Sequence, residues 1–214
     1  MKKFTIGFLL LFLDFNLNFG RFTLNVLPDF VGYWMLLQGM AEMKSANPRF
    51  ESPCTIAKGM LIYTAILWVG ELLGISGGVL VSLLSLIAMA AHFYIAWVLV
   101  QAVRELEQWR EADLYGAVLA KRWKTLLGLN VVIQLLRLLM WVAPVDAVGM
   151  VVAVLVLADI IWAFLFVLGW NRCGKLYEET LAAGGAQAEA EPEETEVSPE
   201  EQAVPTGEEQ ATKE

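Results

Sequence analysis

The sequence predicts an all-α fold, a polytopic bundle of about six transmembrane helices followed by a disordered acidic tail. Two observations predict the bundle. Apolar residues make up 57% of the 214 residues and charged residues only 18%, and the apolar residues are grouped in runs of bilayer length. A third observation predicts the tail, because residues 184–214 contain ten Glu, one Lys and almost nothing to bury. The transmembrane domain is expected over residues 1–180.

The negative charge of the chain belongs to this tail. The whole chain carries a net charge of −8, whereas residues 1–183 contain 14 basic and 13 acidic residues. The membrane domain is therefore close to neutral and has no basic stripe, which excludes nucleic acid as a partner. The tail has two interpretations, a solvated segment or a docking arm for a basic cytoplasmic protein.

Two helices are predicted at the N-terminus. The first covers residues 4–19. It begins like a signal peptide, but no small-x-small cleavage site follows, so we expect it to stay uncleaved. The second covers residues 28–44. Its Pro28 suits a first helical position, and the carboxylate of Asp29 favours the positive end of the helix dipole.

The next two helices are predicted over residues 54–73 and 79–101. Ser52 and Pro53 form an N-cap and first-turn pair for the first of them. The second has no stop signal at its end, and residues 101–122 continue with helical periodicity. We therefore expect this segment to be a helical extension into the cytoplasm.

The last two helices are predicted over residues 123–143 and 146–170. Only Pro144 and Val145 separate them. A linker this short makes the two helices antiparallel neighbours, so their side chains face each other across the membrane.

The distribution of basic residues predicts the orientation. Cytoplasmic loops of membrane proteins are enriched in Lys and Arg, and a cytoplasmic N-terminus places 13 of the 15 basic residues on or near that side. The exceptions are Arg21 and Arg137. Six spans with both termini inside fit this count. A re-entrant hairpin formed by the first two helices fits it equally well, because both ends of the hairpin would also be cytoplasmic.

Ionisable side chains inside the predicted membrane domain are the candidate site. Such groups are costly in lipid and need a partner or a wet cavity. Counted from the helix ends, Asp14, Glu71 and Arg137 share the outer third, while His92 and Asp159 lie near the mid-plane. We expect Arg137 and Asp159 to pair. Side chains point toward the N-terminus of their own helix, so in two antiparallel helices these two side chains approach the same depth in the membrane. Asn130, Gln134 and Arg137 are spaced i, i+4, i+7 and share one face of their helix.

These residues allow two interpretations. They line a polar interior that is open to the outside, or they hold the helices together without a ligand. No catalytic motif or phosphate-binding loop is present, and His92, the only histidine, has no ligand partners at metal-binding spacing. The sequence thus predicts no metal and no cofactor, and it favours a protein that is not an enzyme.

The N-terminal region contains an Asp-Phe that ends an apolar run, followed by a Leu-Pro-Asp-Phe-x-Gly-Tyr motif with Pro28, Asp29, Gly32 and Tyr33. In this pattern the chain resembles a group of small bacterial polytopic membrane proteins. It covers about the first 45 residues. The resemblance implies a multi-pass protein of the bacterial cytoplasmic membrane, and it supplies no catalytic residues.

Two functions follow as expectations. The first is the binding or transport of a small polar solute or ion through the polar interior. The second is a structural or regulatory membrane subunit that engages a protein partner through residues 101–122 or 184–214. In both functions the lipid bilayer is the main partner of the chain.

Overall fold

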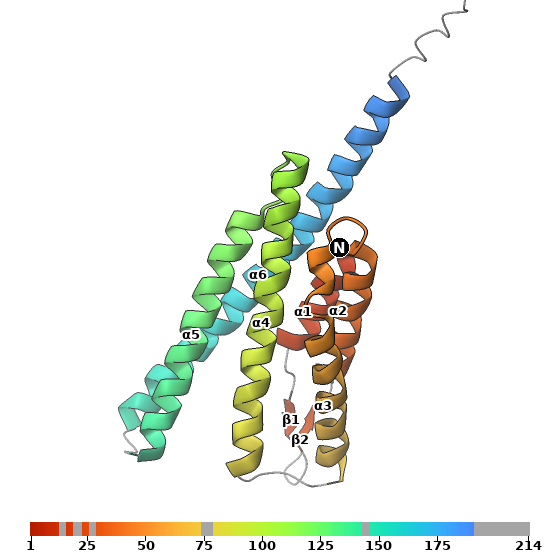
Figure 1. The fold of residues 1–214 in the computed structure, drawn as a ribbon. Coiled ribbons are helices and arrows are strands. Elements are labelled where there is room, and N and C mark those ends of the chain that lie inside the picture. Colours follow the sequence, from red (N-terminus) through yellow and green to blue (C-terminus); the bar gives the residue numbers. More distant parts are fainter. Residues whose placement is uncertain (13–15, 19–22, 26–28, 74–78, 143–145, 191–214) are drawn as a thin grey trace, which may run out of the picture.

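The structure, a computed structural model, describes residues 1–12, 16–18, 23–25, 29–73, 79–142 and 146–190. This part of the chain is helical apart from one short hairpin (Figure 1). The elements are α1 (Lys2–Phe12), β1 (Asn16–Asn18), β2 (Thr23–Asn25), α2 (Asp29–Met43), the 3-10 helix η1 (Pro48–Glu51), α3 (Cys54–Leu72), α4 (Val79–Arg110), α5 (Gly116–Val142) and α6 (Asp146–Ala190).

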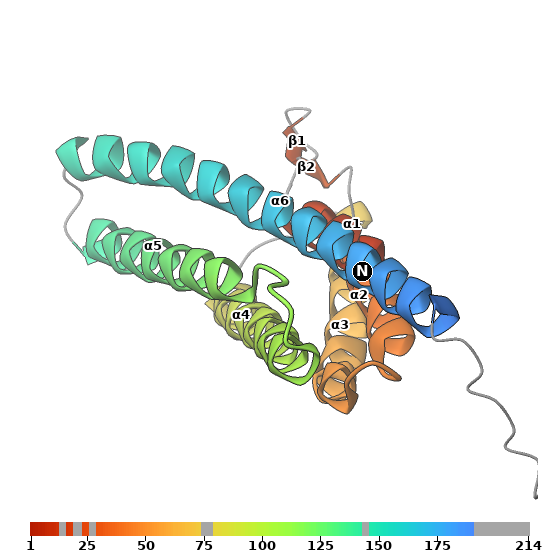
Figure 2. The same cartoon turned by 90° about the horizontal axis from the view of Figure 1, so that it is seen from above.

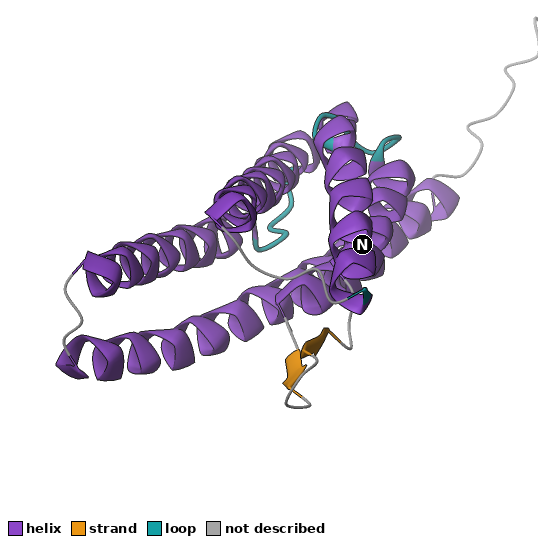
Figure 3. Ribbon diagram, turned by 90° about the horizontal axis from the view of Figure 1, so that it is seen from below, coloured by secondary structure: helices purple, strands orange, loops and turns teal. Residues whose placement is uncertain are grey.

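The six α-helices of the described chain form a ring when seen from above or below (Figures 2 and 3). The order around the ring is α1, α2, α3, α4, α5, α6, and α6 closes the ring by packing against α1. The N-terminus and the C-terminal half of α6 lie toward the same end of the molecule (Figure 1). We call this the N-terminal end.

The first predicted helix is wrong in its length. Residues 4–19 were expected to be helical, but α1 ends at Phe12 and Asn16–Asn18 form strand β1. This strand pairs antiparallel with β2, with Asn16 opposite Asn25 and Asn18 opposite Thr23. The polar-apolar alternation of both strands is the period-two pattern that favours extended backbone over helix.

The other five α-helices of the described chain occur in the predicted order. Two of them have nearly the predicted length, and α4, α5 and α6 are longer than predicted. The predicted helices at 28–44 and 54–73 match α2 and α3 to within a residue. The helix predicted at 79–101 continues to Arg110, as its missing stop signal indicated, and α5 begins at Gly116 instead of residue 123. Helix α6 continues to Ala190, past residue 184, where the disordered tail was expected to begin. Residues 191–214 lie outside the described chain.

Four helical segments are long and apolar enough to cross a membrane: Pro48–Gly70, Leu86–Arg110, Gly116–Met140 and Val148–Ala183. Helices α1 and α2 are not among them. With 11 and 15 residues they reach about 16 and 22 Å, whereas a bilayer core is about 30 Å thick. The structure thus supports a helical membrane protein with four candidate spans among its described residues.

The core lies near the N-terminal end and is rich in aromatic rings. A connected set of ring contacts joins six residues, which we call the aromatic cluster: Phe4, Phe8, Phe12, His92, Phe166 and Trp170. Within it, Phe8 stacks on Trp170 with 5.3 Å between ring centroids, and Phe12 meets His92 edge-on at 4.9 Å. The cluster joins α1 and α6 to α4 inside the ring.

The described residues of the opposite end form little core. Large apolar side chains of α5 and α6 are exposed there, among them Leu135, Leu138, Met150 and Leu157. Exposed apolar surface of this extent is unusual for a soluble protein, and in a membrane it faces lipid.

Glycines allow α1 and α2 to approach with their backbones nearly in contact. A Cβ on Gly32 would lie 2.7 Å from Leu11 Cγ and 3.1 Å from the carbonyl oxygen of Gly7. A Cβ on Gly7 would lie 2.8 Å from Leu36 Cδ2. Small residues are used in this way to pack helices closely in membranes. Gly32, which belongs to the N-terminal motif, therefore has a packing role.

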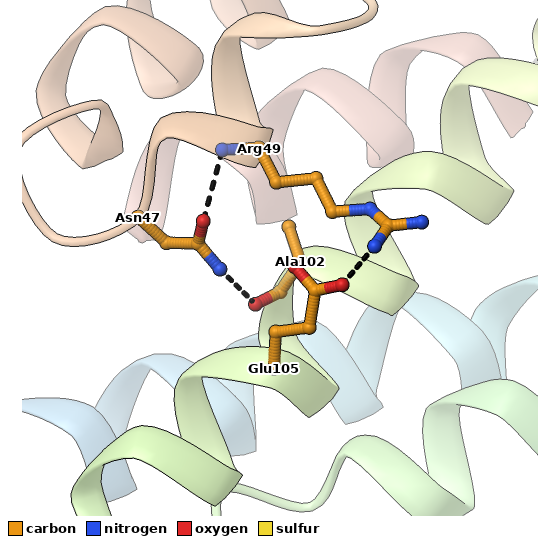
Figure 4. A network of polar contacts seen from close by, with 4 residues as sticks. All are labelled: Asn47, Arg49, Ala102 and Glu105. Atoms are coloured by element: carbon orange, nitrogen blue, oxygen red, sulfur yellow. Dashed lines mark hydrogen bonds and ion pairs between the residues drawn. The ribbon is translucent and has the colours of Figure 1, made fainter.

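A buried asparagine fixes the connection between α2 and α3 onto α4. Asn47 is buried, its Nδ2 donates to the carbonyl of Ala102 at 3.1 Å, and its Oδ1 accepts from the backbone N–H of Arg49 at 2.9 Å (Figure 4). Arg49 also forms an ion pair with Glu105 of α4. The sequence does not predict this contact between the loop and α4.

We expect Asn47→Ala to destabilise the bundle by about 1–3 kcal/mol, because a buried carbonyl loses its donor and η1 loses its N-cap. Arg49→Gln should cost less than about 1 kcal/mol, because the ion pair that it removes is partly exposed. Thermal unfolding of both variants in detergent checks the order. A larger loss of stability in Arg49→Gln than in Asn47→Ala would contradict this account of the loop.

Two further contacts join α5 to its neighbours at the N-terminal end. Glu107 Oε1 accepts from the backbone N–H groups of Leu114 and Gly116, which caps the start of α5. Arg122 of α5 donates to the carbonyl of Leu165 on α6. A Cβ on Gly169 would lie 2.9 Å from Leu119 Cδ2 and 3.1 Å from Arg122 Nη1, so this glycine makes room for the contact.

Candidate functional site

The candidate site lies between α5 and α6 and is built around Asp159. Asn130 Nδ2 donates to Asp159 Oδ1 at 2.8 Å. Asn130 lies twelve residues before the end of α5 and Asp159 thirteen residues after the start of α6, so the two are level in this antiparallel pair. Both residues were predicted site candidates, but their bond to each other was not predicted.

The two oxygens of Asp159 differ in their surroundings. Oδ1 is held by Asn130. Oδ2 has no hydrogen-bond partner among the described residues, and it is not among their fully enclosed unpartnered atoms. A carboxylate with one oxygen held by an amide, and the other unpartnered and not fully enclosed, is suited to accept a proton or to coordinate a cation.

The predicted pair between Arg137 and Asp159 is wrong. Among the described residues no carboxylate lies within 4.0 Å of the Arg137 guanidinium, and the residue is exposed on α5. Arg137 lies seven residues beyond Asn130, which is about 10 Å along the helix. It is too far toward the C-terminal end of α5 to reach a carboxylate that lies level with Asn130.

Gln134 extends the polar face of α5 toward α4. Its Nε2 lies 3.6 Å from Met89 Sδ, a weak contact with a poor acceptor. The face predicted for Asn130, Gln134 and Arg137 is therefore divided. Asn130 faces α6, Gln134 faces α4, and Arg137 faces outward.

The structure does not describe the side chains of two acidic candidates. Asp14 lies outside the described residues. Glu71 belongs to α3, but its side chain lies outside what the structure describes. Their predicted contribution to a polar interior stays a prediction.

His92 lies apart from the polar residues, within the aromatic cluster. Besides Phe12, its ring contacts Phe8 at 6.4 Å and Tyr33 at 6.3 Å between ring centroids. Its Nε2 is buried and has no hydrogen-bond partner among the described residues. The described chain contains no group of three or more His, Cys, Asp or Glu side chains that could hold a metal ion.

The N-terminal motif is mainly structural where it is described. Pro28 lies outside the described residues, and Asp29 is the first residue of α2. Gly32 allows α1 to pack closely against α2, and Tyr33 is buried beside His92. The motif thus accounts for how α2 packs onto α1 and the aromatic cluster.

No protein-family model, no curated protein and no solved structure matches this sequence. The function of the chain is therefore inferred from its own residues.

Proposed function

We propose that this chain is a multi-pass membrane protein that binds a proton or a small cation at Asp159. Such a site serves the binding or transport of a small solute or ion. The observation that carries the proposal is a carboxylate oxygen of Asp159 that has no hydrogen-bond partner among the described residues, in the middle of two apolar helices.

The cost of a charge in a membrane supports this proposal. An unpaired carboxylate at the bilayer centre costs about 2.5–3.5 kcal/mol or more. One hydrogen bond to a neutral amide returns about 1–2 kcal/mol. Asn130 alone therefore does not balance the charge of Asp159, whereas a bound proton or cation removes it.

The basic residues and the ring order support an orientation for the bundle. With α3 to α6 crossing the membrane, the N-terminal end faces the cytoplasm, in agreement with the excess of Lys and Arg there. In this arrangement α1, the β1–β2 hairpin and α2 enter from the cytoplasmic side. A bacterial cytoplasmic membrane is the proposed location.

Asp159→Asn separates binding from helix packing. The variant keeps an oxygen that accepts from Asn130, so the contact between α5 and α6 is preserved, but the charge is lost. We expect the wild-type unfolding midpoint to rise when choline chloride is replaced by NaCl or KCl at constant ionic strength, or when the pH is lowered. The stabilisation should reach about 2.7 kcal/mol at a ligand concentration one hundred times Kd.

The Asp159→Asn variant has no charge to balance, so its midpoint in choline chloride should equal or exceed that of the wild type, and it should show no such rise. Differential scanning fluorimetry in detergent measures both quantities. A rise of equal size in the wild type and the variant, or a flat response in both, would reject Asp159 as the binding group.

A second candidate is a membrane subunit that contacts a protein partner at its cytoplasmic end. It is favoured by the length of α6, whose 45 residues reach about 68 Å and extend well beyond the bilayer core. The segment 101–122 supports it less, because Ala102, Val103, Leu106 and Leu114 are buried inside the bundle. Deleting residues 184–214 should remove a co-purifying partner if the tail is the docking arm.

A further inference from the structure

Two hollows follow one another along α6. The first is an apolar pocket of about 290 Å³, lined by Leu9 and Phe12 of α1 and by Ile160, Ile161, Phe164 and Val167 of α6. The second is a polar groove of about 400 Å³, lined by Leu168, Asn171, Arg172, Lys175, Leu176 and Glu179. The apolar pocket ends where the polar groove begins, one residue further along the same helix.

Five of the residues that line the two hollows lie in one row along α6. Ile161, Phe164, Leu168, Arg172 and Lys175 are spaced by three or four residues, which places them in one row along a helix. Phe164 and Leu168 are exposed. The row thus changes from apolar to basic between Leu168 and Arg172.

The two basic residues of the groove have no anionic partner within the described chain. No carboxylate of the described residues lies within 4.0 Å of Arg172 or Lys175. The guanidinium carbon of Arg172 lies 5.3 Å from the ring centroid of Tyr115, a cation–π contact that holds this side chain in position. Glu179 lies one turn beyond Lys175, at the far end of the groove. Arg172 and Lys175 therefore lie between Glu179 and the apolar residues of the row.

The dimensions of the row match one leaflet of a bilayer. Ile161 and Arg172 are eleven residues apart, which is about 16 Å along the helix. Half of a bilayer core is about 15 Å thick. A basic residue at the cytoplasmic surface and an apolar pocket about 16 Å deeper in the membrane match the headgroup and the acyl chain of a phospholipid.

We propose that this face of α6 binds an anionic phospholipid. Its phosphate contacts Arg172 and Lys175, and one acyl chain runs along Leu168 and Phe164 into the apolar pocket. The charge of the groove selects an anionic headgroup over a zwitterionic one. The proposal shares with the proposed function the premise that α6 crosses the membrane, but it does not depend on ligand binding at Asp159.

Native mass spectrometry of the full chain in detergent tests the proposal, with dioleoyl phosphatidylglycerol, dioleoyl phosphatidylcholine and glycerol phosphate as probes. We expect one phosphatidylglycerol to bind more tightly than phosphatidylcholine, and glycerol phosphate not to bind at the same concentration. Arg172→Gln and Lys175→Gln should each weaken phosphatidylglycerol binding about fivefold, as the loss of one basic contact with an anionic lipid predicts.

Lys58→Gln is the matched control, because Lys58 is an exposed basic residue of α3 away from this face. It should leave the affinity unchanged. Equal binding of the two lipids, unchanged affinity in both groove variants, or binding of glycerol phosphate as tight as that of the lipid would overturn the proposal. Asp159→Asn should retain lipid binding, which distinguishes a failure here from a failure of the proposed function.

Discussion

Phe8→Ala is expected to destabilise the protein by about 3 kcal/mol or more. Phe8 is fully buried, and its ring contacts Trp170, Phe166 and His92 within the aromatic cluster. Truncation leaves a cavity at the junction of α1 with α4 and α6, and Phe→Ala substitutions in packed cores cost about 3–5 kcal/mol. The loss should appear as a lower unfolding midpoint and reduced accumulation in membranes.

Phe164→Ala is the control for this prediction. It makes the same chemical change on α6, but Phe164 is exposed, so little packing is lost. Thermal unfolding followed by size-exclusion chromatography compares the two variants. Equal midpoints for Phe8→Ala and Phe164→Ala would contradict the position of the core at the N-terminal end.

Gly32→Ala should destabilise the contact between α1 and α2 by about 1–3 kcal/mol, the usual cost of overpacking. The added methyl group would lie 2.7 Å from Leu11 Cγ and 3.1 Å from a backbone oxygen, and the backbone cannot rotate away. We expect a lower unfolding midpoint in detergent.

Gly128→Ala is the matched control. No atom lies within 4 Å of a Cβ at this position of α5, so the change should be neutral or stabilising by up to about 1 kcal/mol through helix propensity. A Gly32→Ala variant as stable as Gly128→Ala would show that α1 and α2 do not approach as closely as described.

The sequence predicted the helices best where local signals mark their ends. Pro28 and the Ser52-Pro53 pair lie within two residues of the starts of α2 and α3. The boundaries of α5 and α6 were set too short, because they followed the apolar runs. Ala, Glu and Lys are good helix formers, so a helix continues in water after its apolar run has ended.

The β1–β2 hairpin could have been predicted but was not. Asn-Leu-Asn and Thr-Leu-Asn alternate with period two on either side of Gly20 and Arg21, a hairpin pattern. The apolar run before it directed the prediction toward a helix of membrane length. Local alternation and the length of an apolar run were in conflict, and the local pattern determined the structure.

The partner of Asp159 was missed for a different reason. The depths of the charged residues alone predict Arg137 as the partner. Counted from the turn between α5 and α6, Asn130 is level with Asp159, and it faces α6. The sequence gives the height of each residue along the helix pair. The direction in which each side chain points depends on how the two helices pack.

The most direct test of the central claim is the reaction of the protein with dicyclohexylcarbodiimide, which modifies protonated carboxyl groups in apolar surroundings. We predict that peptide mass spectrometry locates the adduct on Asp159, that Asp159→Asn abolishes it, and that the cation which stabilises the wild type slows it. An unmodified Asp159 after exhaustive reaction, with adducts on other carboxyl groups of the same sample, would contradict an accessible carboxyl group at this position.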